Sequence, residues 1–225
     1  MSDEIEKDPA RTWRGEFGRA YTDRNREESV ADVNAEYEER FGTTKTALYE
    51  RFLDDIDRDA RILEVGCNVG VQLDHLAKLG FENLTGVDLQ RGALEVARTR
   101  RSAPEVIEAD GRSLPFADDT FDLVFTVDVL IHVPPPMIDA VMDELARCSR
   151  EWIYGCEYYA PEYTEAVFCG ETGVLWKTDF AARYESGRDL TLIDETRLTN
   201  DIGDSYTVKD QFVAAFLLRQ SRGCD

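Results

Sequence analysis

Apolar residues recur along the chain in two spacings, and together they predict strands that alternate with helices. Short apolar runs typical of strands occupy residues 61–65, 84–87, 106–109, 121–127 and 152–158. Residues with helical spacing follow four of these runs, near 71–79, 93–100, 135–148 and 160–185, the last of which reads as partly irregular. This alternation predicts a parallel sheet with helices on both faces.

The two ends of the chain depart from the alternating pattern. Helices are expected at about 12–24, 29–41 and 46–54, before the first strand. Two apolar strands, 190–198 and 212–219, close the chain, and the connection between them is too short for a helical crossover. They should therefore be antiparallel. We expect one α/β domain over residues 46–225, preceded by a helical extension over residues 1–45.

The acidic composition limits the partners that the protein can take. Lys and Arg number 26 and Asp and Glu 46, which gives a net charge of −20. Nonspecific binding to nucleic acid or anionic lipid needs a basic surface, so neither is expected. Dispersed acids with few lysines resemble proteins of halophiles that accumulate salt, although a merely acidic protein is the alternative. The start of the chain does not resemble a signal peptide, and a cytoplasmic protein without a membrane span is expected.

Cysteine and histidine give no sign of a metal site. The five cysteines include no Cys-x-x-Cys pair, and the chain has two histidines. Cys67, Cys148 and Cys156 lie in apolar stretches and are expected in the core. No metal cofactor is predicted.

A glycine-containing turn after the first strand is the strongest candidate for ligand binding. Gly66 leaves room for a ligand across the strand end, and Gly70 lets the next helix approach closely. Asp88 ends the second strand, 22 residues after Gly66, and Asp110 ends the third strand, 22 residues after Asp88. Such carboxylates can accept ribose hydroxyls and an adenine amine, although either one alone could be a solvated loop residue. The pattern indicates an adenosine-containing ligand.

The turn differs from that of dinucleotide-binding proteins, because Asn68 replaces the second glycine of Gly-x-Gly-x-x-Gly. Glu64-x-Gly66-x-Asn68-x-Gly70 instead resembles the S-adenosylmethionine (SAM) loop of class I methyltransferases. The segments 114–116 (Leu-Pro-Phe) and 121–125 (Phe-Asp-Leu-Val-Phe) resemble the same family.

This resemblance implies a Rossmann-like α/β fold with a seven-stranded, mostly parallel sheet, an antiparallel last strand and an N-terminal helical lid. It also implies that SAM is the cofactor and S-adenosylhomocysteine the product. Carried over position by position, the cofactor-binding residues in the sheet are Glu64, Gly66, Cys67, Asn68, Gly70, Asp88, Leu89, Asp110, Gly111, Thr126 and Val127.

A narrower resemblance, to methylases associated with pseudaminic acid biosynthesis, covers more of the chain. It begins with residues 15–25 and includes 129–132, 144–149, 157–159 and 177–180. It implies a lid role toward the cofactor for Tyr21, Arg24 and Asn25.

The N-terminal helix has a physical interpretation of its own. Trp13, Phe17 and Tyr21 form an aromatic stripe on one helix face, suited either to core packing or to a lid that excludes water. Arg24 could pair with the carboxylate of a methionine moiety or remain an exposed charge.

Three residues are candidates for catalysis. His132 follows the fourth strand at the mouth of the expected site, where it could act as a base or only pack. Tyr158 and Tyr159 end the fifth strand, and alternation should direct one of them into the site. His75 is read as a surface residue.

The sequence as a whole predicts a SAM-dependent methyltransferase that acts on an oxygen or nitrogen atom of a small molecule. A nonulosonic, pseudaminic-type sugar or its nucleotide conjugate is one candidate acceptor, and another small metabolite is the alternative. The fourth strand lacks Asn/Asp-Pro-Pro-Tyr, which argues against methylation of nucleic-acid bases. A nucleotide-dependent oxidoreductase and a non-catalytic SAM-binding module are the alternatives.

Overall fold

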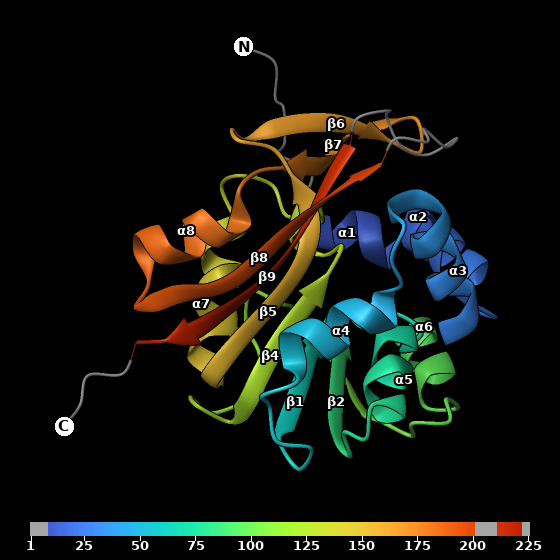
Figure 1. Cartoon of the computed structure of the whole chain (residues 1–225). Coiled ribbons are helices and arrows are strands. Elements are labelled where there is room, and N and C mark those ends of the chain that lie inside the picture. Colours follow the sequence, from blue (N-terminus) through green and yellow to red (C-terminus); the bar gives the residue numbers. More distant parts are fainter. Residues whose placement is uncertain (1–8, 201–210, 222–225) are drawn as a thin grey trace.

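The computed structural model describes residues 9–200 and 211–221. Its main sheet has seven strands in the order β3-β2-β1-β4-β5-β9-β8 (Figure 1). The strands are β1 (Arg61–Val65), β2 (Asn83–Asp88), β3 (Glu105–Glu108), β4 (Phe121–Val127), β5 (Ser149–Tyr159), β8 (Leu190–Asn200) and β9 (Gln211–Gln220).

The pairing of these strands confirms the expected fold. Strands β1 to β5 pair in parallel, and β9 inserts between β5 and β8 in the antiparallel direction. Leu123 and Val124 of the central strand β4 have no exposed surface, as expected where helices cover both faces. Parallel pairing brings the carboxyl ends of β1, β2 and β4 to one edge of the sheet, where α/β folds bind ligands.

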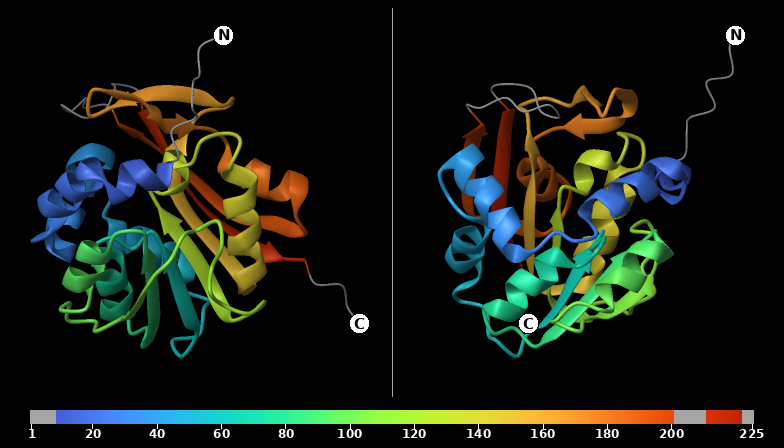
Figure 2. Two further views of the ribbon diagram at one scale, coloured as in Figure 1. Left: turned by 180° about the vertical axis from the view of Figure 1, so that it is seen from behind. Right: turned by 90° about the vertical axis from the view of Figure 1, so that its right-hand side faces the viewer.

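Helices follow the parallel strands as the alternation predicts. They are α5 (Val71–Lys78), α6 (Arg91–Ala97) and α7 (Ile138–Cys148), the last preceded by a short 3₁₀ turn, η1 (Leu130–His132). The helices α4 (Lys45–Leu53) and α7 cover opposite faces of the sheet (Figure 2). None of the described helices is long and apolar enough to span a membrane.

The N-terminal segment forms two short helices in place of the single one expected over 12–24. Helix α1 (Pro9–Arg14) ends before Gly15, and α2 (Glu16–Asn25) starts after it. A β-carbon at Gly18 would lie 1.7 Å from the carbonyl oxygen of Trp13, so only glycine permits this close crossing. Helix α3 (Val30–Phe41) then begins at a Ser29 capping box.

Two further sequence-based expectations were wrong. Residues 160–185 contain an antiparallel hairpin, β6 (Thr164–Phe168) and β7 (Glu171–Lys177), before the helix α8 (Phe180–Gly187). Its turn places Cys169 and Gly170 at positive φ, a geometry that suits two-residue hairpins. His75 is fully buried rather than on the surface, because α4 packs over α5 and Thr46 hydrogen-bonds its Nδ1 at 3.1 Å.

Candidate functional site

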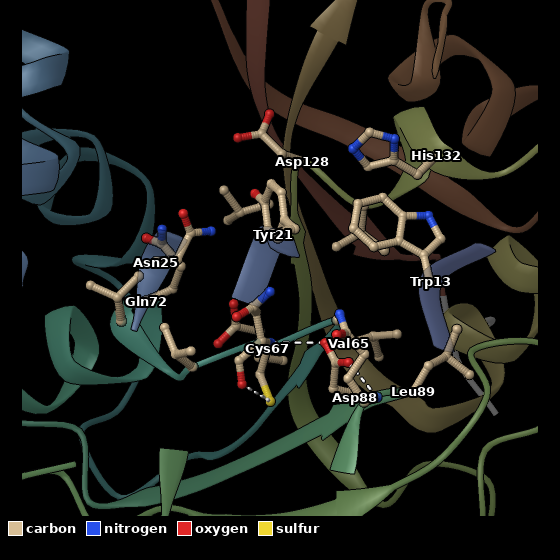
Figure 3. A pocket seen from close by; sticks show the side chains of 18 of the residues that line it. Trp13, Tyr21, Asn25, Val65, Cys67, Gln72, Asp88, Leu89, Asp128 and His132 are labelled. Carbon is tan, nitrogen blue, oxygen red and sulfur yellow. Dashed lines mark hydrogen bonds between the residues drawn. The ribbon is translucent and has the colours of Figure 1, made fainter. Parts of the chain in front are cut away.

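A cavity of about 630 Å³ opens at the carboxyl ends of β1, β2 and β4, beneath α1 and α2 (Figure 3). Its size lies within the roughly 300–1,000 Å³ that is usual for small-molecule sites. Fourteen of the seventeen residues predicted for the site line it: Tyr21, Arg24, Asn25, Glu64, Gly66, Cys67, Asn68, Asp88, Leu89, Asp110, Gly111, Val127, His132 and Tyr158.

The other three predicted residues do not line the cavity. Gly70 has φ +78 and precedes α5, and a β-carbon there would lie 3.2 Å from Ala97 of α6. Thr126 is buried and hydrogen-bonds the carboxyl of Glu157. Tyr159 packs its ring 3.9 Å from the guanidinium carbon of Arg197. Thus one of the two adjacent tyrosines, Tyr158, faces the cavity and the other packs elsewhere.

The turn after β1 is held against β2 by its backbone. The amides of Gly66 and Cys67 both donate to the carbonyl oxygen of Val87, at 2.8 and 2.9 Å. Gly66 has φ +79, and a β-carbon there would lie 2.5 Å from a methyl carbon of Val129. Glycine is therefore required twice, for the left-handed backbone and for the close approach to the segment after β4.

Two polar atoms of this turn have no hydrogen-bond partner in the described structure. They are Oε2 of Glu64 and Oδ1 of Asn68, both buried within residues that line the cavity. Glu64 is 2% exposed, and its burial raises its pKa to about 8. Unpartnered buried acceptors are costly, so a ligand that donates hydrogen bonds fits this wall.

Asp88 connects the ends of β1 and β2. Its carboxylate accepts the amide of Asn68 at 2.9 Å and the amide of Gln90 at 2.8 Å. Burial raises the pKa of Asp88. The backbone amide of Leu89 also hydrogen-bonds this carboxylate. Three of its roughly four acceptor positions are therefore taken, and because the side chain borders the cavity, the remaining one can accept a ligand hydroxyl.

Asp110 is held by its neighbour Arg112. The guanidinium donates from Nε to Oδ1 at 3.0 Å and from Nη2 to Oδ2 at 2.7 Å. This pair keeps the pKa of Asp110 below its usual value, so the carboxylate is ionised at neutral pH. It still lines the cavity and can accept one further hydrogen bond from a ligand.

The helices α1 and α2 cover the cavity with aromatic side chains. The ring of Trp13 lies 5.4 Å from that of Tyr21 and 4.6 Å from the imidazole of His132. The hydroxyl of Thr22 donates to Oε1 of Gln90 at 2.9 Å, which ties α2 to the start of α6. Trp13 and Tyr21 both line the cavity, while Phe17 packs toward Phe168. The three rings do not form one stripe on a single helix as expected, because the break at Gly15 places Trp13 on α1 and the other two on α2.

His132 is 8% exposed and borders the same cavity. Its Nδ1 lies 2.6 Å from the carbonyl oxygen of Val174, which can only accept, so Nδ1 carries the proton. Burial lowers the pKa of His132 to about 4. At neutral pH the ring is uncharged, with the lone pair of Nε2 available to a ligand.

Sequence reasoning did not single out Asp128, Glu28, Tyr37 and Arg40, which also line the cavity. Asp128 directly follows β4 with φ +54, and its Oδ1 is buried without a partner. The signal that marked Asp88 and Asp110, an acid at a strand end, applies equally to this residue. Nothing in the local sequence reveals the other three, because Tyr37 and Arg40 reach the cavity through the packing of α3, and Glu28 lies in the connection between α2 and α3. No group of three or more potential metal ligands occurs among residues 9–200 and 211–221.

Comparison with known proteins agrees with this geometry. The methyltransferase domain family matches residues 63–151. The chain is 37% identical over 109 residues to methyltransferase GfsG of Streptomyces halstedii, across 46% of this chain and 38% of that protein. The chain thus spans well under half the length of this relative.

Two solved structures share the fold. The magnesium protoporphyrin IX methyltransferase of Synechocystis, solved with bound SAM, has a TM-score of 0.66 at 14% identity, over 95% of this chain and 98% of that one. The 1,6-didemethyltoxoflavin-N1-methyltransferase of Burkholderia thailandensis has a TM-score of 0.65 at 12% identity, over 92% and 90%. Residues 63–151 thus match a methyltransferase domain, and the chain shares the fold of a methyltransferase that was solved with bound SAM.

Proposed function

We propose that this protein transfers a methyl group from SAM to an oxygen or nitrogen atom of a small molecule. The observation that carries the proposal is the convergence of Glu64, Asn68 and Asp88 on one cavity, with unpartnered acceptor atoms on the first two. The matched domain family and the GfsG relative support the same chemistry.

Different residues of the chain bind different parts of the cofactor. Asp88 accepts a ribose hydroxyl, Asp110 accepts the adenine amine, and Glu64 with Asn68 accepts the amino group of the methionine moiety. Tyr21, Arg24 and Asn25 close over that moiety from the lid. Bound SAM supplies an electrophilic methyl group on a sulfonium, so the protein mainly aligns the acceptor and excludes water.

The acceptor side of the site involves His132 and Tyr158. The lone pair of His132 Nε2 can take or orient an acceptor proton, and the phenol of Tyr158 can hydrogen-bond the acceptor. The two fold neighbours are named for methylation of magnesium protoporphyrin IX and of 1,6-didemethyltoxoflavin, which supports a small-molecule acceptor. The narrower resemblance adds a nonulosonic sugar as one candidate.

Calorimetric titration with SAM, S-adenosylhomocysteine and NAD, in parallel and at high salt, tests the cofactor. We expect micromolar binding of the first two. Asp88→Ala should weaken it roughly tenfold or more, because a charged hydrogen-bond acceptor is lost. Glu108→Ala, at an exposed position in the neighbouring strand, is the matched control and should bind normally.

Binding of NAD alone would overturn the assignment and favour an oxidoreductase. Tight SAM binding without turnover of any acceptor would identify a SAM-binding module instead. Unfolding curves of both variants separate loss of the site from loss of the fold.

A further inference from the structure

The cavity extends past the cofactor loops toward α2, α3 and the ends of β4 and β5. Seven of its lining residues are carboxylic acids and three are arginines. Four of the acids lie outside the turns assigned to the cofactor: Glu28, Glu36, Glu39 and Asp128. This second region, which we call the acceptor region, is the part of the cavity in which a methyl acceptor would bind.

The arginine of the acceptor region is already engaged. Arg40 donates from Nη1 to Oε1 of Glu36 at 2.6 Å, and it also hydrogen-bonds the phenol of Tyr158. The guanidinium of Arg112 is paired with Asp110. Lys45, which is fully buried, donates to the phenol oxygen of Tyr37 at 2.9 Å. An anionic acceptor would therefore meet the four carboxylates of this region against two nearby cations, Arg40 and Lys45, each of which already makes a hydrogen bond.

The acids of the acceptor region repel one another. The pKa of Glu28 rises to about 7 through burial and through the charges of Glu36, Asp32 and Asp128, against the opposing effect of Arg100. Burial and the charge of Glu36 raise the pKa of Asp128, although Lys45 and Arg40 oppose the rise. A cation in this region would relieve the repulsion.

Aromatic rings and one unsatisfied acceptor complete the environment. The rings of Tyr21, Tyr37 and Tyr158 line the region, and aromatic faces attract cations. The guanidinium of Arg24 already lies 5.2 Å from the centre of the Tyr21 ring, and the ammonium of Lys45 lies 4.6 Å from that of Tyr37. Oδ1 of Asp128 is buried and has no partner in the described structure. Asp128, Tyr21 and His132 point into the same part of the cavity (Figure 3). An ionised carboxylate can only accept, so its missing partner is a donor.

We propose that the methyl acceptor is a small primary or secondary amine, bound as its ammonium ion between Asp128 and the aromatic rings. The proposal rests on the proposed function. It also assigns Asp128 a catalytic role. The ammonium gives one proton to the Asp128 carboxylate, and the freed nitrogen lone pair forms the new bond to carbon. The carbon–sulfur bond breaks with its electron pair on sulfur, so charge and atoms balance.

The carboxylates of the acceptor region favour an amine over the acidic sugar considered from the sequence. A sugar carboxylate would add a negative charge beside Glu28 and Asp128, whereas an ammonium pairs with them. A neutral hydroxyl can fill the hydrogen bond of Asp128 but leaves the repulsion in place.

Three probes of one shape and different charge test the proposal: phenethylamine, phenethyl alcohol and phenylacetate. Each is titrated calorimetrically into the protein saturated with S-adenosylhomocysteine, at the lowest salt that keeps the fold. We expect the amine to bind roughly tenfold or more tightly than the other two, as for a buried charge pair worth over 1.4 kcal/mol. Asp128→Asn should remove that advantage without changing the affinity for S-adenosylhomocysteine. Glu38→Gln, an exposed acid on α3 that does not line the cavity, is the matched control.

The outcomes separate this proposal from the proposed function. Failure of S-adenosylhomocysteine to bind at all refutes the function. If S-adenosylhomocysteine binds normally, three results would refute the amine acceptor while leaving the proposed function intact. They are phenylacetate binding as tightly as the amine, no binding of any probe, and amine binding that is unchanged in Asp128→Asn. Methylation of the amine, with a rate that falls in Asp128→Asn and recovers as pH rises, would support the proton transfer.

Discussion

Single residues at the ends of β1, β2 and β3 carry the proposed cofactor contacts, and their surroundings set the charge of each. Burial raises the pKa of Glu64 to about 8 and also raises that of Asp88. Asp110, paired with Arg112, stays ionised. The site thus combines an acid that is largely protonated at neutral pH with one that is not, and each can meet a different group of the same ligand.

His132 gives a prediction about pH and stability. Its pKa falls from 6.5 in the unfolded chain to about 4 in the folded one, because burial disfavours the charged ring. At pH values between about 4 and 6.5 the unfolded state therefore binds more protons than the folded state does. His132 therefore contributes stability above pH 6.5 that is lost as pH falls toward 4, by at most about 3 kcal/mol. Urea unfolding across this range should show a smaller loss for His132→Gln than for the wild type.

The other histidine provides the comparison. His75 is also buried, and its pKa is lowered to about 3. His75→Gln should therefore also reduce the loss of folding stability as pH falls. Identical pH profiles for His132→Gln and the wild type would mean that the ring is solvated rather than buried.

At the scale of elements, residues of α1 and α2 line the cavity, and we expect these helices to act as a lid. Its buried polar tie to the domain is the hydrogen bond from Thr22 to Gln90, at residues only 4% and 7% exposed. Thr22→Val removes the donor and leaves the Gln90 oxygen unpaired, which costs about 1–3 kcal/mol. Most of this cost should lower the free energy of local opening of α1 and α2, rather than the free energy of global unfolding. We expect faster hydrogen exchange in residues 16–25 and several-fold weaker S-adenosylhomocysteine binding.

A threonine away from the lid provides the control. Thr99 is exposed just after α6 and donates to Val96, so Thr99→Val should leave both measurements unchanged. If hydrogen exchange in α2 is the same in Thr22→Val and the wild type, α2 is part of the rigid core and not a lid.

The β6–β7 hairpin and helix α3 illustrate why some elements escaped sequence analysis. The hairpin has exposed residues on both of its strands, so its apolar pattern is too weak to identify it. Helix α3 was expected, but its contribution to the cavity was not. Tyr37 and Arg40 reach the site only because α3 packs beside it, and no local pattern encodes that placement.

At the scale of the whole molecule, the net charge of −20 predicts a response to salt. Repulsion among surface carboxylates is screened as the Debye length falls from about 10 Å at 0.1 M salt to about 3 Å at 1 M. The melting temperature should then rise by roughly 2–8 °C, since about 1–2 kcal/mol shifts a domain of this size by about 2–4 °C per kcal/mol. Thermal unfolding in KCl, with sucrose as an uncharged control, tests this. A melting temperature independent of KCl would contradict it.

The alternation of strands and helices from β1 to β5, the antiparallel end of the sheet and the acids after β2 and β3 could all be predicted from the sequence. These follow from local periodicity, from connection length and from the rule that ligands bind at strand ends. Only the tertiary structure decided that Tyr158 rather than Tyr159 faces the cavity, that His75 is buried, and that α3 brings acids to the acceptor region. Those outcomes depend on which surfaces pack together across long sequence distances, and burial and charge at such contacts have no local signature.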